Sequence, residues 1–263
     1  FLAGVLPGFL LVGLYSIYVV ITAILWPEVA GGNSALTSVA DTDDHPILGS
    51  AVSLIVLIGS VLGGMWGGLF TPTEAAGIGA LLALIIALIR GVTLRSVYEG
   101  VLSVGRTAAP ILALLLAASL YSRTLTMTGV TTAISDFFGD ANLSTWQIIL
   151  VMTIVWFVLG MIIDSASIML LTVPIFWPIA GTLGIDPIAF ALIGILTIEA
   201  GILTPPFGLL VYTVKAACPP DDPVTLVEIF KGSTPYWICI LVLILAIYLI
   251  PGIASYLPNL LLR

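Results

Sequence analysis

The sequence predicts an all-α, polytopic membrane protein. Of its 263 residues, 60% are hydrophobic and 8% are charged, whereas about a quarter of the residues of an ordinary soluble domain are charged. Apolar stretches recur along the chain, most of them close to the roughly 20 residues that an α-helix needs to cross a bilayer. None shows the alternation, in segments of about 10 residues, that is typical of membrane β-barrels. The stretches lie at 1–25, 47–69, 73–89, 107–122, 145–163, 166–183, 187–203 and 234–262.

The composition argues against several other classes of protein. No basic patch or aromatic stacking platform indicates binding of nucleic acid. No Ser/His, Asp/Asp or metal-binding His/Glu constellation indicates an enzyme, and the only histidine, His45, lies in a polar loop. Cys218 and Cys239 have no cysteine or histidine neighbour, and we interpret them as small hydrophobic residues. We expect neither catalysis nor an organic cofactor.

The first element is predicted to be a helix over residues 1–25, and a polar loop over 26–46 follows it. Residues 47–106 then hold two spanning helices and a connector helix. The connector, LRSVYEGVLSVGR at 94–106, alternates apolar and polar residues at helical spacing, which is typical of a helix lying in the membrane interface. Residues 218–263 are expected to contain a similar interfacial helix, VTLVEIFKG, and the final transmembrane helix.

The junction FTPTEAAG, at residues 70–77, carries the signals of a sharp helix start. Thr71 suits the N-cap position, Pro72 suits the first helical position, and Glu74 completes a capping box. We interpret Thr71 and Glu74 as a structural cap at the membrane surface.

A lone carboxylate, Asp164, interrupts the apolar run from 145 to 183. This run is too long for one span, and the small polar residues of DSAS, 164–167, compete with helical hydrogen bonding. We therefore predict a re-entrant helical hairpin that turns at 164–167 and buries Asp164. An ionisable residue inside the membrane indicates a functional site. The alternative is an aspartate that is protonated, or paired for packing.

A second interruption divides the apolar run at 187–217. Within GILTPPFG, at 201–208, the tandem prolines remove two backbone donors and disfavour helix at Thr204. We predict a broken helix, with the partly negative end of one half near 200–204 and the partly positive end of the other near 207. A proline kink that only shapes the helix bundle is the alternative.

The two interruptions together predict a cation site. An aspartate and serines at a hairpin tip, combined with free carbonyls at a break, supply the oxygen atoms that a hard cation such as Na⁺ requires. Discontinuous helices also mark the substrate sites of secondary transporters. Glu199 lies one turn before the break, where it could pair with hydroxyls of the hairpin tip or relay a proton, and its sequence context does not decide between structure and function.

Several of these stretches closely resemble the large membrane (M) subunit of the tripartite ATP-independent periplasmic (TRAP) transporters. The resemblance covers nearly the whole chain, and the motifs occur in the family's order. The matching stretches are FLAGVLPG at 1–8, FTPTEAAG at 70–77, LGMIIDSASIMLLTVPIFWPI at 159–179, GIDP at 184–187 and IEAGILTPPFGLLVY at 198–212.

The resemblance implies a Na⁺-coupled, elevator-type importer of small organic acids, that is, carboxylates or related anions. It would lie in the cytoplasmic (inner) membrane of a bacterium or archaeon. Its partners would be a small membrane (Q) subunit, a periplasmic substrate-binding protein and the lipid bilayer, with no nucleic acid. By the same resemblance, Asp164 and Thr204 match side-chain ligands of a sodium site. The implied site also includes the backbone at Gly160, Ser165, Gly201 and Gly208, and the substrate would border Ser165, Ser167, Thr204, Pro205 and Pro206.

The resemblance also assigns roles to segments. The chain corresponds to one inverted repeat, the C-terminal half of the family's subunit, so the N-terminal half would be a further partner. Residues 1–25 would be a scaffold helix closing that first repeat, and 47–106 the scaffold pair with its arm. Residues 107–217 would form part of the transport domain, made of helix 107–122, hairpin 145–183 and the broken helix. A scaffold or channel-like subunit without ion-coupled transport is the rival interpretation.

Overall fold

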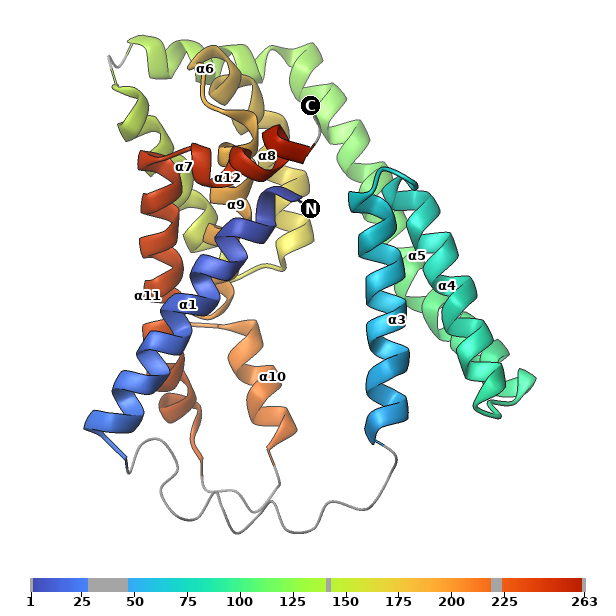
Figure 1. Ribbon diagram of the computed structural model, residues 1–263. Coiled ribbons are helices and arrows are strands. Elements are labelled where there is room, and N and C mark those ends of the chain that lie inside the picture. Colours follow the sequence, from blue (N-terminus) through green and yellow to red (C-terminus); the bar gives the residue numbers. More distant parts are fainter. Residues whose placement is uncertain (1, 28–46, 141–142, 219–223, 262–263) are drawn as a thin grey trace. The chain divides into compact units, whose positions relative to one another are not determined.

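The structure is a computed structural model that describes residues 2–27, 47–140, 143–218 and 224–261. Within these ranges the regular secondary structure is entirely α-helical, which confirms the predicted fold class (Figure 1). Most of the polar loop predicted over 26–46 lies outside the described residues. Contacts divide the chain into two units: residues 27–112 form unit 2, and residues 1–26 with 113–263 form unit 1.

Unit 2 is built on a pair of packed helices, α3 (Ile47–Trp66) and α4 (Pro72–Ile89). The helices approach closely at Gly79, where an added Cβ would lie 2.9 Å from Val61 Cγ2. The capping box expected at the start of α4 is present. Thr71 Oγ1 accepts a hydrogen bond from the Glu74 amide at 3.4 Å, and Glu74 Oε2 accepts one from the Thr71 amide at 2.8 Å.

The separation predicted between an interfacial helix at 94–106 and a span at 107–122 is wrong. Residues Leu94–Thr128 form a single 35-residue helix, α5, with Pro110 inside it. At 1.5 Å per residue, a helix of this length extends about 52 Å, well beyond the roughly 30 Å hydrocarbon core. Polar residues at helical spacing, which indicated an interfacial helix, are equally compatible with the first turns of a longer helix that continues into the apolar residues after 106.

Unit 1 contains the remaining helices. In chain order they are α1 (Leu2–Leu25), the end of α5, α6 (Val130–Asp140), α7 (Thr145–Gly160), α8 (Ser165–Thr182), α9 (Pro187–Ile202), α10 (Leu209–Ala217), α11 (Leu226–Leu249) and α12 (Gly252–Leu261). The interfacial segment expected near 224–232 is continuous with α11, so the separation predicted there is also wrong. The final helix was expected to reach 262 but ends at Leu249, because Pro251 disfavours helix at the residue before it.

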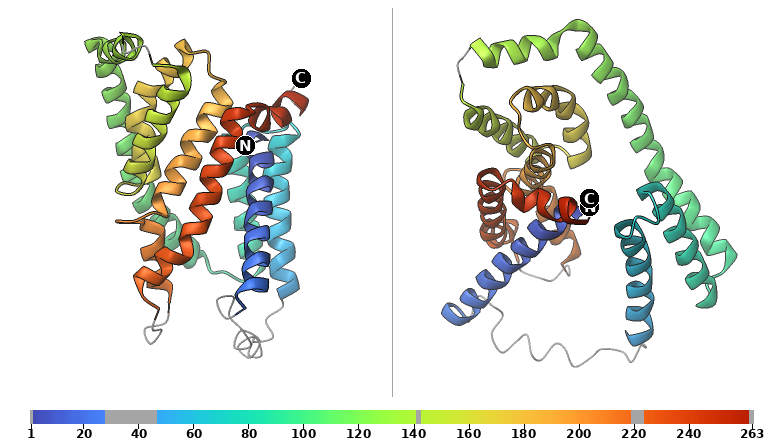
Figure 2. Two further views of the ribbon diagram at one scale, coloured as in Figure 1. Left: turned by 90° about the vertical axis from the view of Figure 1, so that its left-hand side faces the viewer. Right: turned by 45° about the horizontal axis from the view of Figure 1, so that its top comes forward.

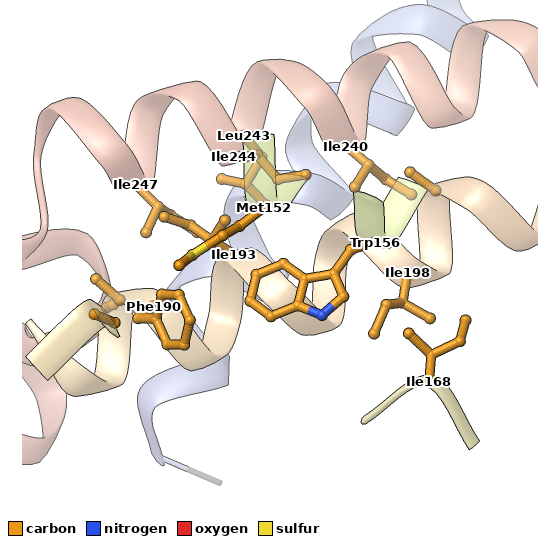
Figure 3. Packing of buried hydrophobic residues seen from close by; sticks show 14 of the residues in the cluster. Met152, Trp156, Ile168, Phe190, Ile193, Ile198, Ile240, Leu243, Ile244 and Ile247 are labelled. Carbon is orange, nitrogen blue, oxygen red and sulfur yellow. The ribbon is translucent and has the colours of Figure 1, made fainter. Parts of the chain in front are cut away.

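Helix α9 is the centre of unit 1. It packs against α1, α7, α8, α11 and α12, and most of its residues are buried, including Phe190 and Ile198, whereas Ile195 is exposed. Met152 and Trp156 of α7 fill the space between α9 and α11, as Figure 3 shows. A helix that packs against five others cannot shift without disturbing several of them, so α9 is a rigid reference for the segments attached to it.

Helices α7 and α8 are joined by a buried polar contact. Trp156 Nε1 donates a hydrogen bond to Thr172 Oγ1 at 2.7 Å, and the Thr172 hydroxyl donates in turn to the carbonyl of Ile168. The Trp156 ring lies over Gly194 of α9, where an added Cβ would be 3.0 Å from the ring. Trp156 therefore links α7 and α8 to each other and packs both against α9.

Several helices match the requirements of a membrane protein. Among the described residues, five helices are long and apolar enough to cross a bilayer: α1, α4, α5, α8 and α11. Helices α7 and α9 have 16 residues each, which corresponds to about 24 Å and falls short of the roughly 30 Å hydrocarbon core. Re-entrant hairpins and broken helices are built from short helices of this kind.

The Trp156–Thr172 contact gives a testable prediction. Thr172→Val removes the acceptor of the buried indole N–H and should lower the free energy of unfolding by about 1–3 kcal/mol. Thr213→Val is a matched control, because Thr213 Oγ1 also donates to the carbonyl four residues earlier but is exposed. Thermal unfolding of the purified protein in detergent would measure both variants, and equal effects would contradict the assignment.

Candidate cation and substrate site

The hairpin turns at Met161–Asp164, between the end of α7 at Gly160 and the start of α8 at Ser165. The predicted turn at 164–167 is therefore misplaced by three residues. Asp164 caps α8, so the small polar residues after it begin the new helix instead of interrupting one. Ser165, Ala166 and Ser167 lie in the first turn of α8.

The carboxylate of Asp164 is bound to its own helix end. Its Oδ2 accepts a hydrogen bond from the Ser167 amide at 3.0 Å, and its Oδ1 accepts one from Ser167 Oγ at 2.7 Å. The side chain is exposed on the surface of the chain. The expectation of a buried acid is wrong, because the carboxylate lies at a helix terminus and faces outward although the neighbouring sequence is apolar.

The broken helix has the form that the tandem prolines predict. Helix α9 ends at Ile202, the backbone is non-helical over Leu203–Gly208, and α10 begins at Leu209. Thr204 is buried, and its hydroxyl donates to the carbonyl of Ala200 at 2.7 Å. Pro205 and Pro206 are both exposed.

Helix α11 holds the break in place, which the sequence did not indicate. Ser233 Oγ donates to the carbonyl of Leu203 at 3.1 Å. Gly208 adopts a left-handed backbone conformation, with φ of 45°, and its missing side chain leaves room for the Phe230 ring. No single motif encodes these contacts, because the partners are about 20 to 30 residues apart in the chain.

The hairpin tip and the break touch through two glycines. A Cβ on Gly160 would lie 2.7 Å from the carbonyl oxygen of Ile198 and 3.0 Å from the Cα of Gly201. A Cβ on Gly201 would lie 2.5 Å from the carbonyl oxygen of Phe157 and 2.8 Å from the Cα of Gly160. The ends of α7 and α9 are therefore in direct backbone contact, and only glycine fits on either side.

A hydrogen bond ties the same two segments together beside the glycines. Ser165 Oγ donates to Glu199 Oε1 at 3.0 Å, and both residues are partly buried. Pairing with a hydroxyl of the hairpin tip was one of the two roles left open for Glu199, and the structure shows this contact.

The contact lies well inside unit 1. In Figures 1 and 2 the break between α9 and α10 lies near the middle of the lengths of α1 and α11, not at their ends. The Gly160–Gly201 contact puts the hairpin tip at the same depth. Two non-helical segments thus meet at mid-length of the helices of unit 1, a depth at which backbone polar groups need protein, water or a ligand as partners.

The oxygen atoms of the two segments fit a hard cation. Within the described residues, the carbonyls of Met161, Ile162 and Ile163, and those of Pro205 and Pro206, accept no hydrogen bond. The Asp164 carboxylate has further lone pairs, and the Thr204 oxygen keeps lone pairs because its hydroxyl is a donor. Carboxylate, hydroxyl and carbonyl oxygens are the donor types that hard cations bind. No cluster of three or more His, Cys, Asp or Glu occurs in the described ranges.

Comparison with known proteins identifies the family. Residues 1–253 match the family described as "Tripartite ATP-independent periplasmic transporter, DctM component". The chain belongs to this family. Together with the spanning helices, this membership makes it a multi-pass protein of the cytoplasmic membrane.

Curated relatives of this TRAP component are named for different substrates. The C4-dicarboxylate large permease DctM of Pseudomonas aeruginosa is 30% identical over 261 residues, covering 98% of this chain and 59% of the relative. The ectoine/5-hydroxyectoine large permease UehC of Ruegeria pomeroyi is 28% identical, covering 99% and 59%. The sialic acid large permease SiaM of Vibrio cholerae is 26% identical, covering 76% and 46%.

The chain spans 59% of the length of the first two of these relatives. All three are named as permeases, which are transport proteins and not enzymes.

The glycine contact gives a second prediction. Gly201→Ala would force the ends of α7 and α9 apart, because the nearest atoms are backbone and cannot move alone, and overpacking of this kind costs roughly 1–3 kcal/mol. Gly181→Ala in α8 is the matched control, since its Cβ would meet no other part of the described chain within 4 Å. Thermal unfolding should show a lower midpoint for Gly201→Ala alone, and an unchanged midpoint would show that the contact is loose.

Proposed function

We propose that this chain takes part in Na⁺-coupled import of small organic acids, delivered by a periplasmic binding protein. The observation that supports this proposal best is the meeting of the hairpin tip with the broken helix through Gly160 and Gly201. Discontinuous helices near the middle of the membrane form the sites of many secondary transporters. Membership of the TRAP family supports the same function.

The helix ends at this position suit an anionic substrate. Helix α8 begins at the hairpin tip and α10 begins at the break, and the N-terminal end of a helix carries partial positive charge and free amide groups. Ser165, Ser167, Thr204 and the exposed prolines would border the substrate. Two relatives are named for C4-dicarboxylates and for sialic acid, both of which are organic acids.

We propose Na⁺ as the coupling ion, held by Asp164, Thr204 and backbone carbonyls of 160–165 and 201–208. Bound Na⁺ would supply the positive charge that brings carboxylate and carbonyl oxygens of the two segments together. In the chain itself, Asp164 lies four residues beyond Gly160 and Thr204 lies three beyond Gly201, so both follow the glycine contact closely in sequence. This proximity in sequence to the contact supports the assignment.

The proposed partners follow from the family, whose transporters are described as tripartite. They are a small membrane subunit and a periplasmic substrate-binding protein. An elevator motion would carry the hairpin and broken helix across the membrane against the scaffold helices. Because the chain spans 59% of the length of its first two relatives, a scaffold or channel-like role is the competing function, and uptake that needs a Na⁺ gradient separates the two.

The role of Asp164 can be tested apart from its role as a cap. Asn is as good an N-cap residue as Asp, so Asp164→Asn should keep the helix start but remove the charge that a cation needs. We expect a large rise in the Na⁺ concentration for half-maximal uptake by the assembled transporter. Thr204→Val should give a milder rise, because one neutral ligand is lost.

Asp186→Asn is the matched control, because Asp186 caps α9 through the amide of Ala189 at 2.8 Å and lies outside the proposed site. Its Na⁺ curve should equal that of the wild type. Unchanged Na⁺ dependence in Asp164→Asn would show that this carboxylate acts only as a cap.

The broken helix gives a further prediction. Pro205→Ala combined with Pro206→Ala restores two backbone donors and should extend helix across the break, which would occupy the carbonyls proposed as ligands. Na⁺-dependent uptake should fall strongly while the amount of assembled protein is maintained. Wild-type sodium affinity in this variant would mean that the break is only a kink.

A further inference from the structure

Glu199 is an acid that the proposed cation site leaves without a role. It lies on α9 between Ile198 and Ala200, both of which are buried, and its own side chain is partly buried. Within the described chain, no Lys or Arg forms an ion pair with Glu199. An ionisable side chain in such a helix is costly and therefore calls for a specific role.

The contact that Glu199 makes is directional and joins two segments. Its Oε1 accepts the hydrogen bond from Ser165 Oγ at 3.0 Å. Ser165 is the first residue of α8, so the bond fixes the point where the hairpin turn becomes helix. Glu199 lies two residues before Gly201, at which α9 meets the end of α7.

The two contacts constrain different motions. The glycine contact sets how closely the end of α7 approaches α9, but a contact between two Cα atoms does not fix rotation or sliding. The Ser165–Glu199 hydrogen bond fixes the position of the other side of the turn, at the start of α8. Together they hold both ends of Met161–Asp164 against the last turn of α9, from which the break at Leu203–Gly208 continues.

We propose that Glu199 is a positioning residue that, by accepting the Ser165 hydrogen bond, holds the hairpin tip in register with the broken helix. This inference rests on the proposed function, because the register matters only if the two segments share a ligand. The role requires a hydrogen-bond acceptor, not a negative charge. A glutamine oxygen accepts the same bond, whereas alanine leaves the serine hydroxyl without it.

The test is hydrogen–deuterium exchange of the hairpin tip in lipid nanodiscs, measured in choline buffer without Na⁺. Amides of the turn, such as those of Ile162, Ile163 and Ser167, form hydrogen bonds within the tip and report its opening. In Glu199→Ala, peptides covering 161–168 should exchange about 2- to 10-fold faster, as expected for loss of one hydrogen bond. Glu199→Gln should restore the wild-type rate.

Two further variants complete the design. Ser165→Ala removes the same bond from the other side, so the double variant with Glu199→Ala should exchange no faster than Glu199→Ala alone. Glu99→Ala is the control for losing a glutamate, because Glu99 is exposed and pairs only with Arg95 on its own helix. Its exchange at 161–168 should equal that of the wild type.

Transport gives a second readout. Glu199→Ala should raise the Na⁺ concentration for half-maximal uptake with a smaller effect on the maximal rate, and Glu199→Gln should restore it. Wild-type exchange at the tip of Glu199→Ala, or a Glu199→Gln variant as defective as Glu199→Ala, would overturn the inference. If uptake by the wild-type transporter does not depend on Na⁺, the proposed function is refuted. The hydrogen–deuterium exchange of the variants can still be compared in that case, so failure of the proposed function is distinguishable from failure of this inference.

Discussion

The close approach of Gly160 and Gly201 is the constraint on which the rest of the site depends. An added Cβ on either residue would collide with backbone. The ends of α7 and α9 can therefore touch only where these two glycines face each other. The hairpin tip and the break follow these residues directly in the chain and are placed by the same contact. A geometry that is fixed by packing needs no bound ligand to form, and this is a condition for a preorganised binding site.

The surrounding helices support this contact from separate directions. Trp156 joins α7 to α8 through Thr172 and fills the space above Gly194 of α9. Helix α11 supports the break through Ser233. Asp164 combines two requirements: it terminates the turn by capping α8, and it presents a carboxylate at the surface of the chain. The cap explains why an acid can occupy this position in the absence of a cation, and the proposed ion site explains why an acid is present where asparagine would cap equally well.

Local chemistry in the sequence predicted the fold class, the capping box at Thr71, and the two interruptions, because hydropathy, proline and capping residues act over a few positions. It placed the hairpin turn three residues late, since serines that follow an N-capping aspartate start a helix and do not break it. It also divided α5 and α11, because the mixed apolar and polar residues of 94–106 and 224–232 indicated separate interfacial helices, whereas each segment continues into the apolar helix that follows. The Gly160–Gly201 contact and the support from Ser233 depend on tertiary packing, and no local pattern encodes them.

The most direct test of a cation site at this contact is the thermal unfolding midpoint of the purified chain, titrated with NaCl against choline chloride at constant ionic strength. An ion that binds only the folded state stabilises it by RT ln(1 + [Na⁺]/Kd), about 2.7 kcal/mol at 100 times Kd. The midpoint of the wild type should therefore rise with Na⁺ concentration and not with choline, and the rise should be lost when Gly201→Ala separates the tip from the break. Equal midpoints in the two salts, or an undiminished Na⁺ effect in Gly201→Ala, would contradict a sodium site built on this contact.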